Sequence, residues 1–255
     1  MREWSLNFDH PLGGEDASCS FVAAVRSKHG APAVLKVGMP HMEGEDEIEG
    51  LRFWNGDPTV GLLAAADEVG AMLLERCLPG TTLRALPEDD QDFVIAGLLR
   101  RLWRKRPARG RFRQLSAMTR DWSKETLAKA QSWPDPALVH EGLELFEELP
   151  STATTEVLLA TDLHAGNVLR AEREPWLVID PKPFLGDPAY DLTQHLLNCW
   201  VRLRSDPMRT MQNFSRLLGI EPERVRLWMF ARLAAEPRDD WNDQAKLALA
   251  KKIGR

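Results

Sequence analysis

Several features that mark particular protein classes are scarce in this sequence. Only three cysteines occur among 255 residues, at positions 19, 77 and 199, and no two of them form a C-x-x-C pair. An odd, scattered set argues against a disulfide framework or a zinc site and is typical of a reducing compartment. The longest apolar stretch, VGLLAAA at 60–66, is far too short to cross a bilayer, and the start lacks the apolar core of a signal peptide. We therefore expect a cytoplasmic protein with no membrane partner.

A surplus of basic charge is also missing. The net charge is −5 and the isoelectric point is near 5.8. Proteins that bind nucleic acid need a basic face, so we expect no nucleic-acid partner. Apolar residues make up 44% and charged residues 28% of the chain, which is ordinary for a globular protein. A chain of this length can bury the core of one large domain or of two modest lobes.

The character of the chain changes near LPGTTL, at residues 78–83. Before this point, apolar and β-branched runs predict short strands and a single helix at 43–54. The predicted strands are at 4–8, 19–25, 33–37, 60–67 and 71–77. After it, helical periodicity dominates, except for three short strands expected within 156–180. The predicted helices are at 87–103, 135–149, 187–201, 207–218, 222–235 and 239–252.

Three polar residues follow strand-like runs between positions 156 and 180. Asp162 and Asn167 stand five positions apart, and Asp180 ends the run WLVI. A carboxylate can orient a hydroxyl group and accept its proton, while amide and carboxylate oxygens suit Mg²⁺ held together with phosphates. An Asp, four residues, an Asn and a later Asp is also the spacing of kinases. Turns capped by Asx side chains would explain one of these residues, but not the ordered set, so we predict phosphoryl transfer.

Such a reaction needs a cation for the nucleotide phosphates. Lys36 ends the apolar run AVLK and is followed by an acidic helix. Glu47 lies four residues before Leu51, on the same helix face, which makes it the expected ion-pair partner of Lys36. Glu45 and Glu49 remain alternatives.

The stretches DLHAGNVL and VIDPKPFLGDPAYDLTQHLLN resemble the aminoglycoside phosphotransferase family. Within it, they are most similar to the streptomycin 6-phosphotransferase and hydroxyurea phosphotransferase group, which LRFWNG and LLERCLPGTTL also fit. The resemblance implies an α+β, protein-kinase-like fold of two lobes. A small antiparallel-sheet lobe at 1–78 would bind the nucleotide, and a larger, mainly helical lobe at 79–255 would hold the catalytic and substrate sites. The implied cofactors are ATP and Mg²⁺, and the partner is a small molecule that bears a hydroxyl group.

The resemblance also assigns roles to single positions. Asp162 matches the catalytic residue, and Asn167 and Asp180 match the magnesium ligands. Lys36 matches the lysine that contacts the nucleotide phosphates, with Glu47 as its ion-pair partner.

Four further positions are expected to support the nucleotide or the catalytic loop. The backbone at Arg76 and Leu78 would form hydrogen bonds with the adenine. Ser18, in the loop PLGGEDASCS, would donate to a phosphate oxygen. Asp191, in GDPAYDL, would brace the catalytic loop from the following helix.

The acceptor is less well defined by the sequence. Lys182 would lie near the transferred phosphate or an anionic group of the substrate, and Glu236 and Asp240 are candidates for binding a polycationic aminoglycoside. The family usually has His-Gly before the catalytic Asp, whereas this chain has Ala160-Thr161. That departure keeps open a non-catalytic, nucleotide-binding pseudokinase. A kinase of a housekeeping sugar or amino alcohol is the other alternative.

Overall fold

The computed structural model describes residues 4–12, 20–39, 41–104 and 106–255 and divides the chain into two compact units. The first, called the sheet unit, comprises Met1–Pro87 and Ala165–Pro183. The second, called the helical unit, comprises Glu88–His164 and Phe184–Arg255. Both units are discontinuous, because 165–183 belongs with the N-terminal residues. The functional boundary that we predict at 78/79 stays a prediction.

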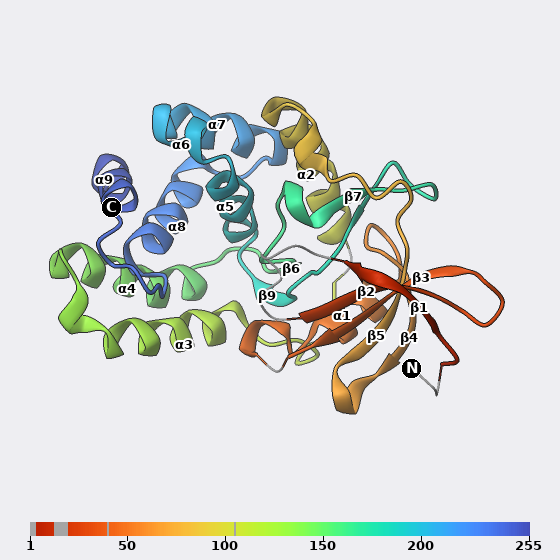
Figure 1. Ribbon diagram of the computed structural model, residues 1–255. Helices are drawn as coiled ribbons and strands as arrows, with labels where there is room; N and C mark the ends of the chain where they lie inside the picture. Colours follow the sequence, from red (N-terminus) through yellow and green to blue (C-terminus); the bar gives the residue numbers. More distant parts are fainter. Residues whose placement is uncertain (1–3, 13–19, 40, 105) are drawn as a thin grey trace. The chain divides into compact units, whose positions relative to one another are not determined.

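The sheet unit contains a five-stranded antiparallel sheet in the order β1-β2-β3-β5-β4 (Figure 1). The strands are β1 (Asn7–Leu12), β2 (Ser20–Arg26), β3 (Pro32–Gly38), β4 (Leu62–Ala66) and β5 (Ala71–Glu75). The alternation of side chains along β3 gives the sheet two buried faces. Leu35 packs with Ala23 and Val25 on one face, and Val34 packs with Met72 and Leu74 on the other.

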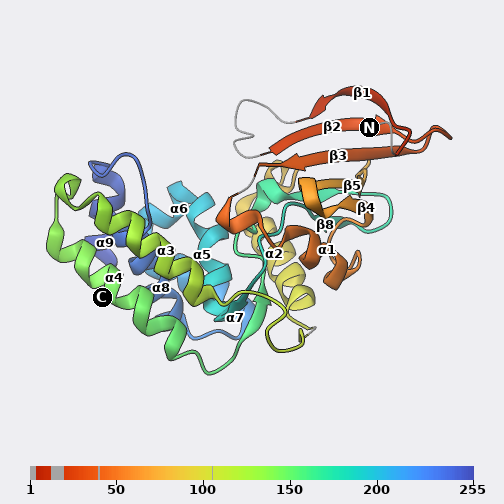
Figure 2. The same cartoon turned by 90° about the horizontal axis from the view of Figure 1, so that it is seen from below.

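The helix α1 (Glu47–Trp54) covers the second of these faces (Figure 2). Its buried Leu51 contacts the cluster of Met72 and Leu74. Lys36 lies two residues after Val34 and therefore points to the same side of β3 as this helix. The period of the strand thus directs a lysine towards the acidic helix.

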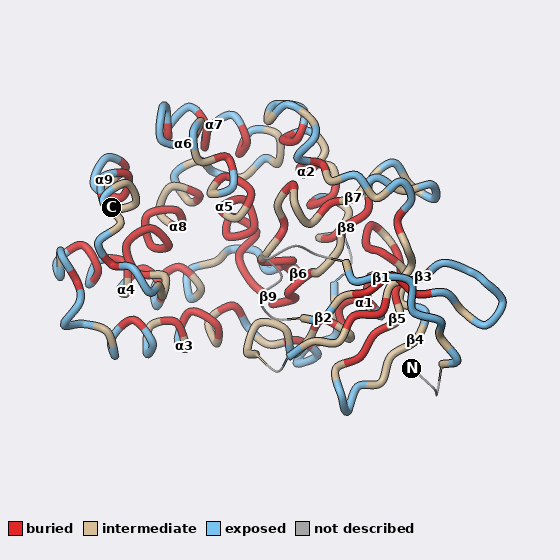
Figure 3. Tube along the Cα trace, viewed as in Figure 1, coloured by how far each residue is buried: buried red, intermediate tan, exposed pale blue. Residues whose placement is uncertain are grey.

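The helical unit is built around α8, which packs against α4, α5, α7 and α9. Figure 3 shows that α5 and α8 are the most thoroughly buried of these helices, which fits their place at the centre of the unit. The helices are α2 (Glu88–Leu102), α3 (Leu115–Ala128), α4 (Pro136–Ser151), α5 (Pro188–Asn198), α6 (Trp200–Ser205), α7 (Pro207–Leu218), α8 (Pro222–Ala235) and α9 (Gln244–Ile253).

Three of these helices begin with the same dipeptide, Asp-Pro. The carboxylates of Asp135, Asp187 and Asp206 each accept a hydrogen bond from a backbone N–H in the first turn. A proline at the first helical position loses no hydrogen bond, and its fixed φ suits the helix. The Asp-Pro pairs therefore define where α4, α5 and α7 start.

Two short strand pairs complete the described structure. In the helical unit, β6 (Val157–Leu159) pairs with β9 (Phe184–Gly186), and in the sheet unit β7 (Val168–Arg170) pairs with β8 (Trp176–Val178). Among the residues that the structure describes, we find no helix with the length and apolarity needed to cross a bilayer.

Most predicted elements are present, with differences at both ends of the chain. The first strand begins at Asn7 rather than residue 4 and ends at Leu12 rather than residue 8, because His10, Pro11 and Leu12 also pair with β2. The last helix begins at Gln244, five residues later than predicted, since Asp243 caps it. The sequence patterns missed α3 and the three-residue strand β9, and the single helix predicted at 187–201 is divided into α5 and α6. The helices α7 and α8 have the predicted bounds.

Candidate active site

Four charged side chains, three of them buried, form a cluster in the sheet unit. The ammonium nitrogen of Lys36 donates to both carboxylate oxygens of Glu47 at 2.6 Å. It also contacts Oδ1 of Asp180, and the ammonium of Lys182 contacts the same oxygen. Lys182 lies 3.7 Å from Glu47. Two lysines and two carboxylates therefore balance in charge, and we call this set the charge cluster.

Burial and ion pairing act differently on the two carboxylates of the charge cluster. Burial raises the pKa of Glu47 above its ordinary value, although Lys36 and Lys182 act in the opposite direction. Burial would also raise the pKa of Asp180, but the two ammonium groups outweigh it and hold the pKa below its ordinary value. The Asp180 side chain keeps 34% of its surface exposed, against 5% for Glu47. Asp180 is thus the more accessible, ionised carboxylate.

The β7–β8 hairpin brings Asn167 and Asp180 to its open end. Val168 pairs with Val178, and the backbone N–H of Ile179 donates to the Asn167 carbonyl at 2.9 Å. Asn167 therefore directly precedes the paired Val168, and Asp180 follows Ile179 at the end of the opposite strand. Their amide and carboxylate oxygens are hard donors, so the side chains present fit a magnesium ion.

In the helical unit, Asp191 holds the backbone next to Asp162. The buried carboxylate of Asp191 accepts hydrogen bonds from the N–H of Ala160 at 3.2 Å and of Thr161 at 2.9 Å. It also accepts one from Nε1 of Trp103 at 2.9 Å. Thr161 has φ +44°, a left-handed conformation that is unfavourable for a β-branched residue. The contacts of Asp191 thus support a strained residue directly before Asp162.

Burial also sets the protonation of Asp191. It raises the pKa to about 6, although the hydrogen bonds from Trp103, Ala160 and Thr161 favour the ionised form. The carboxylate therefore remains ionised at neutral pH, but its pKa lies close to the physiological pH range.

The side chain of Asp162 is contacted from α5. Nε2 of Gln194 donates to Oδ1 of Asp162 at 2.6 Å, and the oxygen of Gln194 accepts from Arg232 at 2.7 Å. His164 lies 3.9 Å from the same Asp162 oxygen. Sequence reasoning missed Gln194 and Arg232. The sequence gives a weak indication for Gln194, which stands three residues after the predicted Asp191 and therefore on the same face of the helix.

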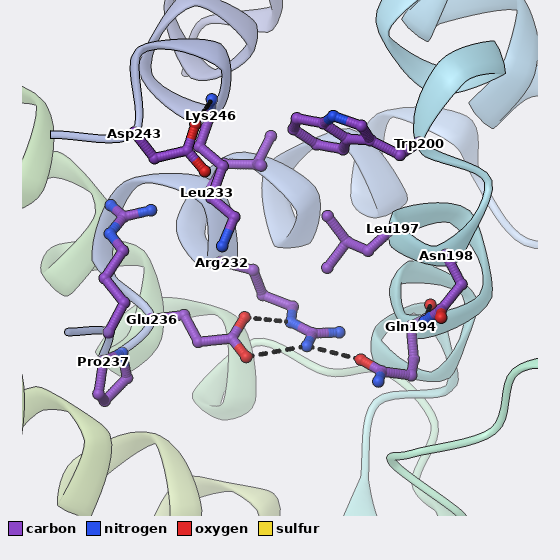
Figure 4. Close-up of a pocket in the computed structure, with 11 residues that line it drawn as sticks. Gln194, Leu197, Asn198, Trp200, Arg232, Leu233, Glu236, Pro237, Asp243 and Lys246 are labelled. Atoms are coloured by element: carbon purple, nitrogen blue, oxygen red, sulfur yellow. Dashed lines mark hydrogen bonds and ion pairs between the residues drawn. The ribbon is translucent and has the colours of Figure 1, made fainter. Parts of the chain in front are cut away.

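Gln194 and Arg232 line a pocket of about 440 Å³ in the helical unit (Figure 4). Its lining is rich in polar and charged groups. The lining residues are Gln194, Leu197, Asn198, Trp200, Arg232, Leu233, Glu236, Pro237, Arg238, Asp243 and Lys246. Glu236, predicted as an acceptor-binding residue, lies in this pocket and pairs with Arg232 at 2.8 Å.

The other predicted residues lie apart from these contacts. Arg76 follows β5 directly, and Leu78 is partly exposed in the segment after it. Asp240 is exposed and accepts a hydrogen bond from the N–H of Asn242 at 2.9 Å. It is absent from the lining of the pocket. Ser18 lies outside the described residues.

A second group of possible metal ligands occurs in the helical unit. Asp92, His195 and Cys199 are buried together, with His195 Nε2 at 2.8 Å from Asp92. Arg202 donates two hydrogen bonds to Asp92, each of 2.8 Å, and burial raises the pKa of the Cys199 thiol to about 11. The guanidinium of Arg202 occupies both carboxylate oxygens of Asp92, and the thiol is protonated. Both features disfavour a cation, so we interpret this group as a structural link between α2 and α5.

Comparison with known proteins adds to this geometry. Residues 9–241 match the model of the aminoglycoside/hydroxyurea antibiotic resistance kinase family. The chain belongs to this family. The resemblance seen in DLHAGNVL and IDPKPFLGDPAYDL is therefore confirmed, and it extends over nearly the whole chain.

Named relatives in the resistance-kinase family are similar over most of their length. A streptomycin 6-kinase from Streptomyces griseus is 37% identical over 243 residues, which cover 91% of this chain and 78% of that protein. A hydroxyurea phosphotransferase from Kitasatospora aureofaciens is 32% identical over 242 residues, which cover 91% of this chain and 68% of that protein.

Solved structures confirm the protein-kinase-like fold. The choline kinase LicA from Streptococcus pneumoniae has a TM-score of 0.68 and 13% identity, covering 96% of this chain and 94% of that one. A spectinomycin phosphotransferase has a TM-score of 0.51 and 15% identity, and the match covers 97% of this chain and 88% of that one. At such low identity these structures show the fold alone.

Proposed function

We propose that this resistance-kinase family member transfers the γ-phosphoryl group of ATP to a hydroxyl group of a small molecule, with a streptomycin-type aminoglycoside or hydroxyurea as the acceptor. The relatives named streptomycin 6-kinase and hydroxyurea phosphotransferase support this acceptor class. The observation that carries the proposal is the buried contact of Lys36 with both Glu47 and Asp180.

The sheet unit would supply the nucleotide site. Lys36 would contact the phosphates, with Glu47 fixing its ammonium group. Asn167 and Asp180 would hold Mg²⁺, which when bound neutralises charge on the phosphates. The backbone at Arg76 and Leu78 would contact the adenine. Because the transition state of phosphoryl transfer is loose, such positioning and charge neutralisation supply most of the catalysis.

The helical unit would supply the acceptor site. Asp162 would orient the acceptor hydroxyl and take its proton. The pocket is polar and offers hydrogen-bond partners to an acceptor with several hydroxyl groups. Its charged lining residues are Glu236, Asp243, Arg232, Arg238 and Lys246. Lys182 belongs to the charge cluster and would contact the transferred phosphate.

The proposal can be tested by mass spectrometry. The purified protein is incubated with Mg-ATP and, separately, with streptomycin, hydroxyurea, choline and a panel of sugars and amino alcohols. We expect a mass increase of one phosphate on streptomycin or hydroxyurea, strongly reduced with Asp162→Asn. Product on a sugar or amino alcohol alone would overturn the acceptor class. Nucleotide binding without any product would favour the pseudokinase.

A further inference from the structure

Gln194 connects the pocket of the helical unit to the carboxylate of Asp162. Its nitrogen donates to Asp162 at 2.6 Å and its oxygen accepts from Arg232 at 2.7 Å. A guanidinium group can only donate hydrogen bonds, so the amide oxygen must face Arg232 and the amide NH₂ must face Asp162. Chemistry therefore fixes the orientation of this amide.

Arg232 is a firm anchor for that amide. Its side chain is 5% exposed, pairs with Glu236 at 2.8 Å and donates to Oγ1 of Thr193 at 2.8 Å. The guanidinium also lies 5.1 Å from the centre of the Tyr190 ring. With this many partners, the guanidinium has little freedom to turn away from Gln194.

The helix α5 contacts the loop before and at Asp162 with two side chains. Asp191 binds the backbone of Ala160 and Thr161, and Gln194, one turn later, binds the side chain of Asp162. The first contact fixes where the loop runs, while the second fixes the rotation of its carboxylate. These tasks are separable, so replacing Gln194 leaves the hydrogen bonds from the backbone to Asp191 in place.

We propose that Gln194 is a positioning residue that orients the Asp162 carboxylate towards an acceptor in the pocket, with Arg232 and Glu236 setting the direction of its amide. This inference rests on the proposed function. In the transfer step, the acceptor oxygen bonds to the γ-phosphorus while the bond to the β-phosphate oxygen breaks and ADP leaves with its electron pair. The hydroxyl proton passes to Asp162, whose rotation Gln194 sets.

The test compares Gln194→Met with Gln194→Glu. Methionine keeps the length of the side chain but removes the donor to Asp162 and the acceptor for Arg232. Glutamate keeps the acceptor for Arg232 and puts a second carboxylate against Asp162. The matched control is Gln212→Met, the same replacement at an exposed position of α7. For each protein we would measure the melting temperature, kcat, both KM values and the pH profile.

We expect Gln194→Met to lower kcat about 10- to 100-fold, as misplacement of a reacting group does, with the KM for Mg-ATP unchanged. Gln194→Glu should also shift the acid limb of the kcat profile to higher pH, because a like charge raises the pKa of a carboxyl group. His164 and Arg232 also act on Asp162 and are unchanged in both variants. Gln212→Met should match the wild type.

The outcomes separate the inference from the proposed function. An active wild type with a folded Gln194→Met variant of equal kcat would overturn the positioning role and leave the kinase assignment intact. If Gln194→Met does not fold, the Gln194→Glu variant decides. An acid limb of its kcat profile at the same pH as in the wild type would overturn the positioning role. A wild type that phosphorylates no acceptor in the panel would overturn both.

Discussion

The charge cluster of the sheet unit and the surroundings of Asp162 in the helical unit are built from different interactions. In the charge cluster, ammonium groups neutralise carboxylates, and Lys36 and Lys182 share one oxygen of Asp180. Around Asp162, backbone N–H groups and an amide make directed hydrogen bonds of 2.6–3.2 Å. Ammonium groups are compact charges with rotatable donors, whereas amides and backbone groups fix a direction.

This difference matches what each region would have to do. A nucleotide brings several negative charges and a metal ion, so its site needs cations that can exchange one anionic partner for another. A hydroxyl acceptor needs a single carboxylate at a defined angle, since small misplacements of reacting groups are costly. The four predictions below test this division, from the largest expected effect to the smallest.

The largest effect is expected at Asp162. Asp162→Asn removes the proton acceptor but keeps the shape of the side chain, so phosphate transfer should fall about 10²–10⁴-fold. Steady-state kinetics with the best acceptor would measure the loss. Binding of Mg-ATP should be unchanged in the same protein. A variant with more than half of the wild-type rate would contradict the assigned role.

The charge cluster should respond to loss of Lys36 with reduced stability. Lys36→Met leaves the buried Glu47 without its nearest cation, which should lower the free energy of unfolding by roughly 3–5 kcal/mol. Urea denaturation at pH 7 would measure this. The double variant Lys36→Met/Glu47→Gln removes both charges and should recover most of the loss. A double variant as unstable as the single one would show that the charge pair is not the cause.

Asp191 should give the protein a distinct dependence on pH. Its pKa of about 6 in the folded chain exceeds the ordinary value of 3.8. The folded state thus holds the proton more tightly, and the stability from this group is present below pH 4 and lost as the pH rises through 6. The slope is at most about 1.4 kcal/mol per pH unit.

Denaturation curves between pH 4 and pH 7 would measure this term as the difference between the wild type and Asp191→Asn. The free energy of unfolding should fall with rising pH more steeply in the wild type than in the variant. Parallel curves would mean that Asp191 titrates normally.

The smallest effect is expected at Thr161. Its φ of +44° suits glycine, so Thr161→Gly should raise the free energy of unfolding by about 1 kcal/mol. The control is Thr152→Gly at φ −105°, where glycine has no such advantage. It should be destabilising, also because the hydroxyl hydrogen bonds to Glu148 and Arg224 are lost. Thermal melting would measure the stability of both variants relative to the wild type. A loss of stability at both positions would show that the left-handed conformation is not costly here.

The sequence patterns predicted most strands and helices and the pairing of Lys36 with Glu47, because both depend on patterns that are local in the chain. The two-lobe, protein-kinase-like fold came instead from the resemblance to a known family. The alternation along β3 directs Lys36 to the helix side, and the spacing of Glu47 and Leu51 shows which acid faces it. The hairpin between Asn167 and Asp180 could likewise be read from two short apolar runs. The assigned roles of these residues stay predictions until the variants are measured.

The contacts of Asp162 could not be read in the same way. Gln194 and Arg232 are 38 residues apart, and both occupy helices in which a polar residue usually faces solvent. Their meeting depends on how α5 packs against α8, which no local pattern encodes. The left-handed Thr161 was missed for a similar reason, because β-branched residues rarely adopt that conformation.

The division between the two regions is tested most directly by the affinity for a non-hydrolysable Mg-ATP analogue. Calorimetry would compare the wild type with Asp162→Asn and Lys36→Met, each checked for folding. We predict that Asp162→Asn binds the analogue with wild-type affinity, whereas Lys36→Met binds at least about tenfold more weakly, a difference of about 1.4 kcal/mol. Full affinity in a folded Lys36→Met variant, or its loss in Asp162→Asn, would contradict the division.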